Sequence, residues 1–226
     1  MLSKFQVRYD WEELVEWAGV AAISLPPMPS KEELRHGHLH PVVRLSKKDG
    51  RREFVWMREG LIPSYACDER GAEQRAEAHA EAMTCDSCFR SAFRRRRCLI
   101  PANRLTERRH LAKGIEQPCA FQLETGGTFG IAAVWETWTN DQGHSIDSFA
   151  IVSALVIPTL RTLFDRMPVV LRNKDEQDRW LNVSRDHEHP PLDLLRPMSV
   201  AELRDWRMIP GDVDLQISKA DHALHL

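Results

Sequence analysis

Seven short apolar segments constrain the fold of this chain more than any other feature. They are rich in β-branched and aromatic residues, which is typical of strands. Helical patterns do not alternate with them, so the chain lacks the strand–helix–strand order of a parallel sheet. The sequence predicts a single α+β domain with a mostly antiparallel, barrel-like β-sheet flanked by helices. The predicted strands span residues 41–45, 53–57, 98–101, 119–123, 128–135, 148–156 and 168–172.

Capping residues mark the predicted helices. Asp10 and Glu13 form a capping box, and Gly19 provides a stop signal. Ser199 and Glu202 repeat this pattern near the end of the chain. Residues 216–226 are weakly patterned, and we expect residues 205–226 to be a divergent tail of one domain spanning 1–226. The other predicted helices span residues 30–37, 85–97 and 175–181.

Composition places the chain among soluble globular proteins, with 42% hydrophobic and 28% charged residues in 226. Its longest nearly apolar run, residues 149–157, is too short to cross a bilayer, and no secretory signal opens the sequence. Five cysteines, an odd and small number, favour reduced thiols over a disulfide framework. We therefore expect a cytoplasmic protein that has no membrane partner.

A basic run breaks the near-neutral charge balance. Between residues 90 and 109 there are eight arginines and one acid, Glu107, although the net charge of the whole chain is −2. Such a run is typical of a surface that binds an anionic partner. The alternative is a solvated helix end, since Arg94 to Arg97 would suit the carbonyl end of a helix. Glu107, among these cations, can act as a base, orient a substrate or form a surface ion pair.

Other motifs provide little chemistry. His36, His38 and His40 have no paired ligand motif, and Cys85 and Cys88 form an isolated CxxC, so we expect no metal site. The chain has no Walker loop and no G-x-G-x-x-G motif for a cofactor, and it has no G-x-S-x-G nucleophile elbow. The sequence alone therefore predicts no cofactor.

Several segments, in the same order, resemble the SOS-response-associated peptidase (SRAP) family. The most specific are SFAIVSA (148–154) and the segment that contains Asp-Arg-Met-Pro-Val. The resemblance extends over residues 1 to 205. The matching segments are GLIPSY (60–65), RAEA (75–78), FRSAFRRRRCLIPANRLTE (89–107), FGIAAVWETW (129–138) and FDRMPVVL (164–171).

The resemblance implies a positively charged channel for single-stranded DNA, abasic or at junctions, in the DNA damage response. In the family, a cysteine after the initiator Met captures the abasic aldehyde as a thiazolidine, and a glutamate and a histidine move the protons. Glu107 matches that glutamate, and Asp165 has the place of the acid after the histidine. The residues expected to contact DNA are Arg75, Arg94, Arg95, Arg96, Arg97, Arg104, Arg108 and Arg166.

The chain departs from this pattern at the reacting groups. Leu2 stands at the family's cysteine, and a bulky residue there should also prevent removal of Met1. Phe164 stands at the histidine and Glu73 at a sugar-holding asparagine. We therefore expect a DNA-binding relative that has lost the cysteine crosslink. Two alternatives stay open: a residual peptidase- or hydrolase-type enzyme that uses Glu107, and a phage-related module that binds protein.

Overall fold

A computed structural model describes residues 4–6, 10–20, 39–110, 116–162, 164–183 and 189–210. The second predicted helix, at 30–37, lies outside these residues. No helix within the described part of the chain is both long and apolar enough to cross a membrane.

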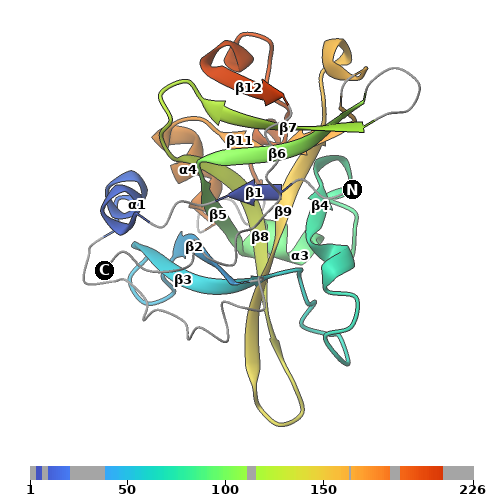
Figure 1. The fold of residues 1–226 in the computed structure, drawn as a ribbon. Helices are drawn as coiled ribbons and strands as arrows, with labels where there is room; N and C mark the ends of the chain where they lie inside the picture. The colour runs from blue at the N-terminus through green and yellow to red at the C-terminus, as the bar shows by residue number, and fades with distance from the viewer. Residues whose placement is uncertain are drawn as a thin grey trace, which may run out of the picture.

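The larger sheet closes into a five-stranded barrel of β9, β3, β2, β5 and β8 (Figure 1), because β8 pairs with β9 as well as with β5. Only β3 meets β9 in parallel within the barrel; the other pairs are antiparallel. This confirms the predicted barrel-like α+β fold. The strands of this sheet are β2 (Leu39–Leu45), β3 (Arg52–Glu59), β4 (Glu77–His79), β5 (Arg97–Ala102), β8 (Phe129–Thr139), β9 (Ser145–Leu155), β10 (Arg166–Pro168) and β11 (Val170–Leu171).

A second, four-stranded sheet lies across one end of the barrel in Figure 1. Its strand order is β1-β6-β7-β12, and all of its pairings are antiparallel. The sequence patterns did not indicate β12, which falls in the segment expected to be a divergent tail. The bounds are β1 (Lys4–Gln6), β6 (Arg104–His110), β7 (Glu116–Leu123) and β12 (Trp206–Pro210).

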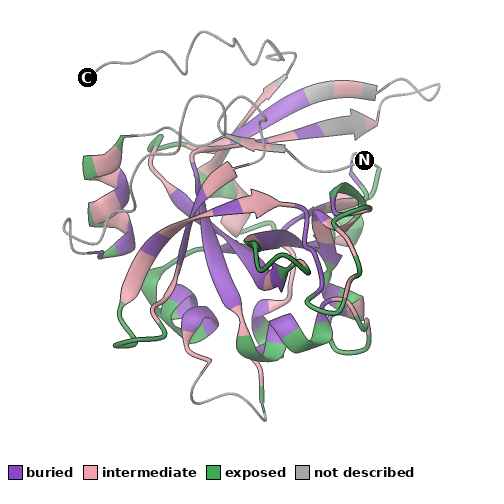
Figure 2. Ribbon diagram, turned by 90° about the horizontal axis from the view of Figure 1, so that it is seen from below, coloured by how far each residue is buried: buried purple, intermediate pink, exposed green. Residues whose placement is uncertain are grey.

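Most of the core consists of two clusters, one on each face of the barrel wall, and a small third cluster contains Ile62, Ala72 and Trp138. Along β8, Ile131, Ala133 and Trp135 belong to one cluster, whereas Ala132 and Val134 belong to the other. This alternation follows from the two-residue period of a strand. The first cluster continues into β6 and β7, so the barrel interior and the small sheet share one core. Figure 2 shows the buried stretches of the strands gathered at the centre of the fold.

Three helices cover the outer cluster: α1 (Trp11–Ala18), α3 (Arg90–Arg95) and α4 (Lys174–Leu181). The predicted cap of α1 is confirmed: the Asp10 side chain accepts a hydrogen bond from the Glu13 amide, and Gly19 ends the helix at a φ of 64°. Near the end of the chain, Ser199 and Glu202 form their capping box, but only a short 3₁₀ turn follows, η7 (Glu202–Asp205). The other short 3₁₀ turns are η2 (Glu73–Arg75), η3 (Ala80–Ala82), η5 (Pro158–Leu160) and η6 (Leu192–Leu194).

Candidate functional site

Glu107 lies on β6, the strand that pairs with the amino-terminal strand β1. Its side chain is 9% exposed, and Cys119 lies opposite it in β7. Strand β1 runs along the other edge of β6, where Lys4 lies opposite Thr106. Lys4, the first residue of β1, therefore lies opposite the residue that precedes Glu107. The carboxylate is thus nearly buried in the interior cluster and adjacent to the amino-terminal strand.

The segment 164–166 connects this sheet to the barrel. The ring of Phe164 is 3% exposed and packs against Phe121 of β7. Asp165 is exposed, and its Oδ2 lies 3.4 Å from Nε2 of His110 at the end of β6. Arg166 begins β10, which pairs with β9. These three residues therefore contact, in turn, β7, β6 and the barrel.

Arg166 holds β10 against the neighbouring elements. Its Nη2 donates to Glu81 Oε2 at 2.6 Å and to the Ser153 carbonyl at 2.8 Å, and its Nε donates to the Ser153 hydroxyl. Burial opposes the charge on Glu81, but hydrogen bonds from the Leu155 amide and from Arg166 together hold its pKa below the ordinary value. These bonds engage two of the three guanidinium nitrogens of Arg166 in internal contacts.

Arg75 supports the loop that follows β3. Its Nε donates to the Leu61 carbonyl at 2.9 Å, and its Nη2 donates to the Arg70 carbonyl at 3.1 Å. Gly60 lets the Ala72 backbone approach this loop, because a Cβ at position 60 would lie 2.6 Å from the Ala72 carbonyl oxygen, and the φ of Gly60 is 96°. The same loop presents Tyr65, which is 67% exposed. Arg75 and Tyr65 therefore belong to one ordered surface segment.

Arg97 has an internal role that the sequence did not indicate. It is 2% exposed. Its guanidinium donates to the carbonyls of Phe93, Trp180 and Asn182 at 2.5 to 2.9 Å. An arginine in this environment joins α3, β5 and α4 and does not face solvent, so we remove Arg97 from the residues expected to contact DNA.

The neighbouring arginines have different environments. Arg96 donates to Glu136 Oε2 at 2.5 Å and to the Trp135 carbonyl. Burial raises the pKa of Glu136, although the charge of Arg96 opposes that rise. Arg94 and Arg95 are exposed on α3. Of the four consecutive arginines, these two present free charge to the surface.

The rest of the basic run lies on the small sheet. Arg104 begins β6, and its Nη2 lies 3.4 Å from Gln122 Oε1. Arg108 is also in β6, but its side chain lies outside the described part of the structure. Since α3 packs on the outer face of the barrel, the basic run divides between two layers of the fold.

Among the described residues, the cysteines and histidines do not gather into a metal-binding cluster. Cys98 is buried in the barrel, and burial raises the pKa of its thiol. Cys88 Sγ lies 3.5 Å from the Tyr65 hydroxyl, and Cys85 is exposed. His36 and His38 lie outside the described residues, and within those residues no group of three metal-ligating side chains converges.

Comparison with known proteins identifies the family. The family model for "SOS response associated peptidase (SRAP)" matches residues 1–214. The chain belongs to the SRAP family. It is 28% identical to the abasic site processing protein YoaM of Bacillus subtilis over 152 residues, which are 67% of this chain and 66% of YoaM. It is 26% identical to YobE of the same organism over 217 residues, which are 92% of this chain and 94% of YobE.

Solved structures confirm the SRAP fold. A protein from Bordetella bronchiseptica superimposes with a TM-score of 0.70 at 22% identity, covering 92% of this chain and 99% of that one. A protein from Bacteroides thetaiotaomicron superimposes with a TM-score of 0.65 at 21% identity, covering 76% of this chain and 73% of that one. At these identities, the likeness establishes the fold alone.

Proposed function

We propose that this SRAP protein binds single-stranded DNA in the DNA damage response and does not form the cysteine crosslink. The relatives YoaM and YobE are abasic site processing proteins, which supports abasic DNA as the class of ligand. Undamaged single-stranded DNA and DNA junctions present the same phosphate groups as abasic DNA. A surface that binds phosphates would accept all of these forms.

The burial of Phe164 supports the loss of the covalent chemistry. This residue stands at the position of the family's histidine, yet its ring is 3% exposed and belongs to the interior cluster. A hydrocarbon ring cannot accept or donate a proton, so the acid–base pair is reduced to Glu107. Leu2 removes the thiol at the cysteine position.

The exposed cations and aromatic ring supply contacts for a nucleic acid strand. Arg94 and Arg95 are exposed on α3, and Nη1 of Arg75 makes no hydrogen bond with any described residue. Tyr65, 67% exposed in the loop that Arg75 supports, offers a face on which a base can stack. We assign phosphate contacts to Arg75, Arg94 and Arg95, and further contacts to Arg104 and Arg108 on β6. Arg96 and Arg166 contribute mainly by supporting this surface.

The test is an anisotropy titration with a labelled single strand, plain or abasic, at two salt concentrations, followed by a denaturing gel. We expect binding that weakens steeply with salt and no covalent band. The double variant R94E/R95E should bind more weakly, whereas R51E/R161E, which changes two other exposed arginines, should bind nearly as well as the wild type. Unchanged affinity in R94E/R95E contradicts the proposed surface, and a covalent band on abasic DNA contradicts the loss of crosslinking.

The nearly buried Glu107 favours a second candidate, residual hydrolysis. A carboxylate that is 9% exposed beside the amino-terminal strand has the partial burial that tunes an acid–base group. In this case E107Q abolishes turnover of an abasic or peptide substrate but retains DNA binding. Equal turnover by E107Q and the wild type rules this candidate out.

A further inference from the structure

A small cavity opens between α1, α4, η7, β12 and the start of β8. Its volume is about 140 Å³, and none of its lining residues belongs to the candidate site described above. Leu123, at the end of β7, borders it, four residues beyond Cys119, the partner of Glu107. The cavity is therefore a separate feature of the fold.

Aromatic rings form much of the cavity wall. Phe129 and Trp206 meet edge to face, with 4.6 Å between their centroids, and Trp17 approaches from α1. Gly130 makes this approach possible, because a Cβ there would lie 3.2 Å from Trp17 Cζ2 and 3.5 Å from Gln177 Nε2. One indole ring and one side-chain amide therefore lie close to the same point of the backbone.

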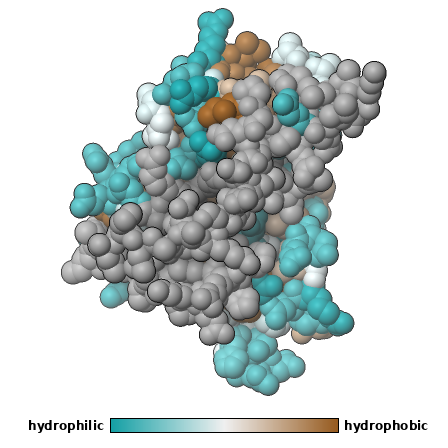
Figure 3. Space-filling model, viewed as in Figure 1, coloured by the Kyte–Doolittle hydropathy of each residue, from teal (hydrophilic) through white to brown (hydrophobic). Residues whose placement is uncertain are grey.

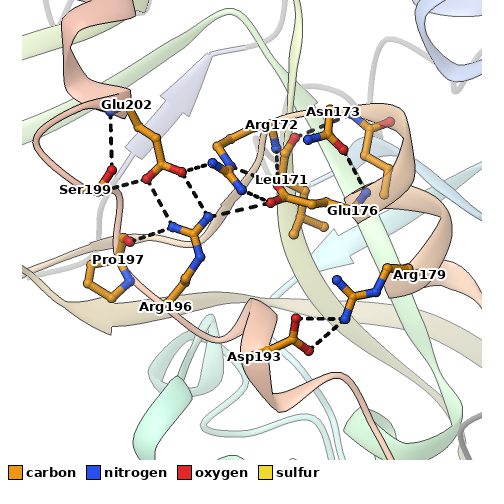
Figure 4. A network of polar contacts seen from close by, with 11 residues as sticks. Leu171, Arg172, Asn173, Glu176, Arg179, Asp193, Arg196, Pro197, Ser199 and Glu202 are labelled. Atoms are coloured by element: carbon orange, nitrogen blue, oxygen red, sulfur yellow. Dashed lines mark hydrogen bonds and ion pairs between the residues drawn. The ribbon is translucent and has the colours of Figure 1, made fainter.

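Ion pairs fix the charged side of the cavity (Figure 4). Arg172 pairs with Glu176 and with Glu202, and Arg196 donates to Glu202 at 2.9 and 3.0 Å. Arg172 and Glu202, which line the cavity, are therefore held by ion pairs. At the surface, Figure 3 shows hydrophobic residues at the end of the molecule where Figure 1 places β12.

The side-chain amide of Gln177 is only weakly hydrogen-bonded to its neighbours. The residue is 5% exposed, and the one hydrogen bond that its side chain makes with the described residues is a long one, from Nε2 to the Leu171 carbonyl at 3.5 Å. The amide therefore retains a carbonyl oxygen and an N–H for a ligand. The carboxylate of Asp205 lies at the exposed side of the same cavity. With Glu202 and Asp205 against Arg172, the lining is net negative, which disfavours a phosphate group here.

We propose that this cavity binds a single pyrimidine-type ring, which packs against the aromatic wall and pairs its adjacent N–H and C=O groups with the Gln177 amide. The size fits, since an apolar protein cavity of about 150 Å³ binds benzene, a single six-membered ring. Side-chain amides read the hydrogen-bonding edges of bases with such a donor–acceptor pair, and aromatic rings stack on either face of a base. The ring can come from a free nucleoside or from a DNA strand.

Saturation-transfer NMR and tryptophan fluorescence with uracil and thymidine test the site. We expect both ligands to bind, and Q177M, which keeps the side-chain length but removes both polar atoms, to bind about tenfold more weakly. The control Q142M changes an exposed glutamine in the β8–β9 turn and should bind as the wild type does. Failure of the wild type to bind, or equal binding by Q177M, overturns the proposal.

A second variant keeps the test decisive if Q177M folds poorly. W206L removes one aromatic wall from an edge strand, and we expect a similar loss of affinity for thymidine. Unchanged affinity in a folded W206L overturns the proposed stacking.

A thymidine oligonucleotide then identifies the source of the ring. Competition between oligonucleotide and thymidine supports a base from a strand, and its absence supports a free nucleoside. The test of the cavity is independent of the proposed DNA surface, because Arg94 and Arg95 do not line the cavity. The variant R94E/R95E should therefore still bind thymidine.

Discussion

The ring of Phe164 lies edge to face against Phe121, with 5.4 Å between the centroids and 70° between the ring planes. Phe121 lies opposite Leu105 in β6, two residues from Glu107. This contact holds the segment 164–166 against the small sheet. Phe164 therefore contributes to the stability of the fold.

F164A should lower the free energy of unfolding by about 3–5 kcal/mol, the usual cost of removing a fully buried phenylalanine ring. Urea denaturation measures this loss. Y65A, which removes an aromatic ring that is 67% exposed, should stay within about 0.5 kcal/mol of the wild type. A small effect of F164A would show that the ring does not pack as described.

R97M should destabilise the fold by roughly 3 kcal/mol or more, because three buried carbonyls lose a charged donor. R95M changes an exposed arginine two positions away and should leave stability nearly unchanged while weakening DNA binding. Thermal unfolding and the anisotropy titration separate the two effects. If R97M were as stable as R95M, the internal role of Arg97 would be wrong.

The barrel could be predicted from the sequence because its strands carry their pattern locally. The apolar runs of β8 and β5 identify each strand without knowledge of its partner. By contrast, β12 is recognisable only through its pairing with β7, where Trp206 lies opposite Leu123. The side chains of residues 206–209 are half-buried or exposed, so the strand lacks the signal of a fully buried one.

The sequence proposes residues for the candidate site but does not indicate their environments. Arg95 and Arg97 are identical in sequence, but the chain changes from α3 to β5 between them, so one faces solvent and the other the core. The pairing of His110 with Asp165 joins positions 55 residues apart, and no local pattern indicates it. Both outcomes depend on tertiary packing.

Thiol accessibility should follow the same division between surface and core. Cys67 and Cys85 are exposed, whereas Cys98 and Cys119 are buried, and burial raises the pKa of the Cys98 thiol. Iodoacetamide should therefore alkylate Cys67 and Cys85 quickly and reach Cys98 only in denaturant. Peptide mass spectrometry identifies the modified residues. Rapid labelling of Cys98 under native conditions would contradict the closed barrel.

The ion-pair cluster around Glu202 should make stability depend on pH in the acid range. Burial works against the charge of Glu202, but hydrogen bonds from Arg196 and Ser199 lower its pKa from 4.5 to about 2. Because the folded-state pKa lies below the unfolded one, the stabilisation is fully present above pH 4.5 and is lost as the pH falls toward 2. A shift of this size corresponds to a contribution on the order of 3 kcal/mol.

E202Q should therefore unfold more easily than the wild type at pH 7, and the difference between the two should shrink at pH 3. Urea denaturation at both values measures this, with E124Q, an exposed glutamate at the end of β7, as the control. The control should follow the wild type at both pH values. A difference between E202Q and the wild type that stays constant from pH 7 to pH 3 would mean that the carboxylate charge of Glu202 does not stabilise the fold, and that the cluster beside the cavity acts through packing alone.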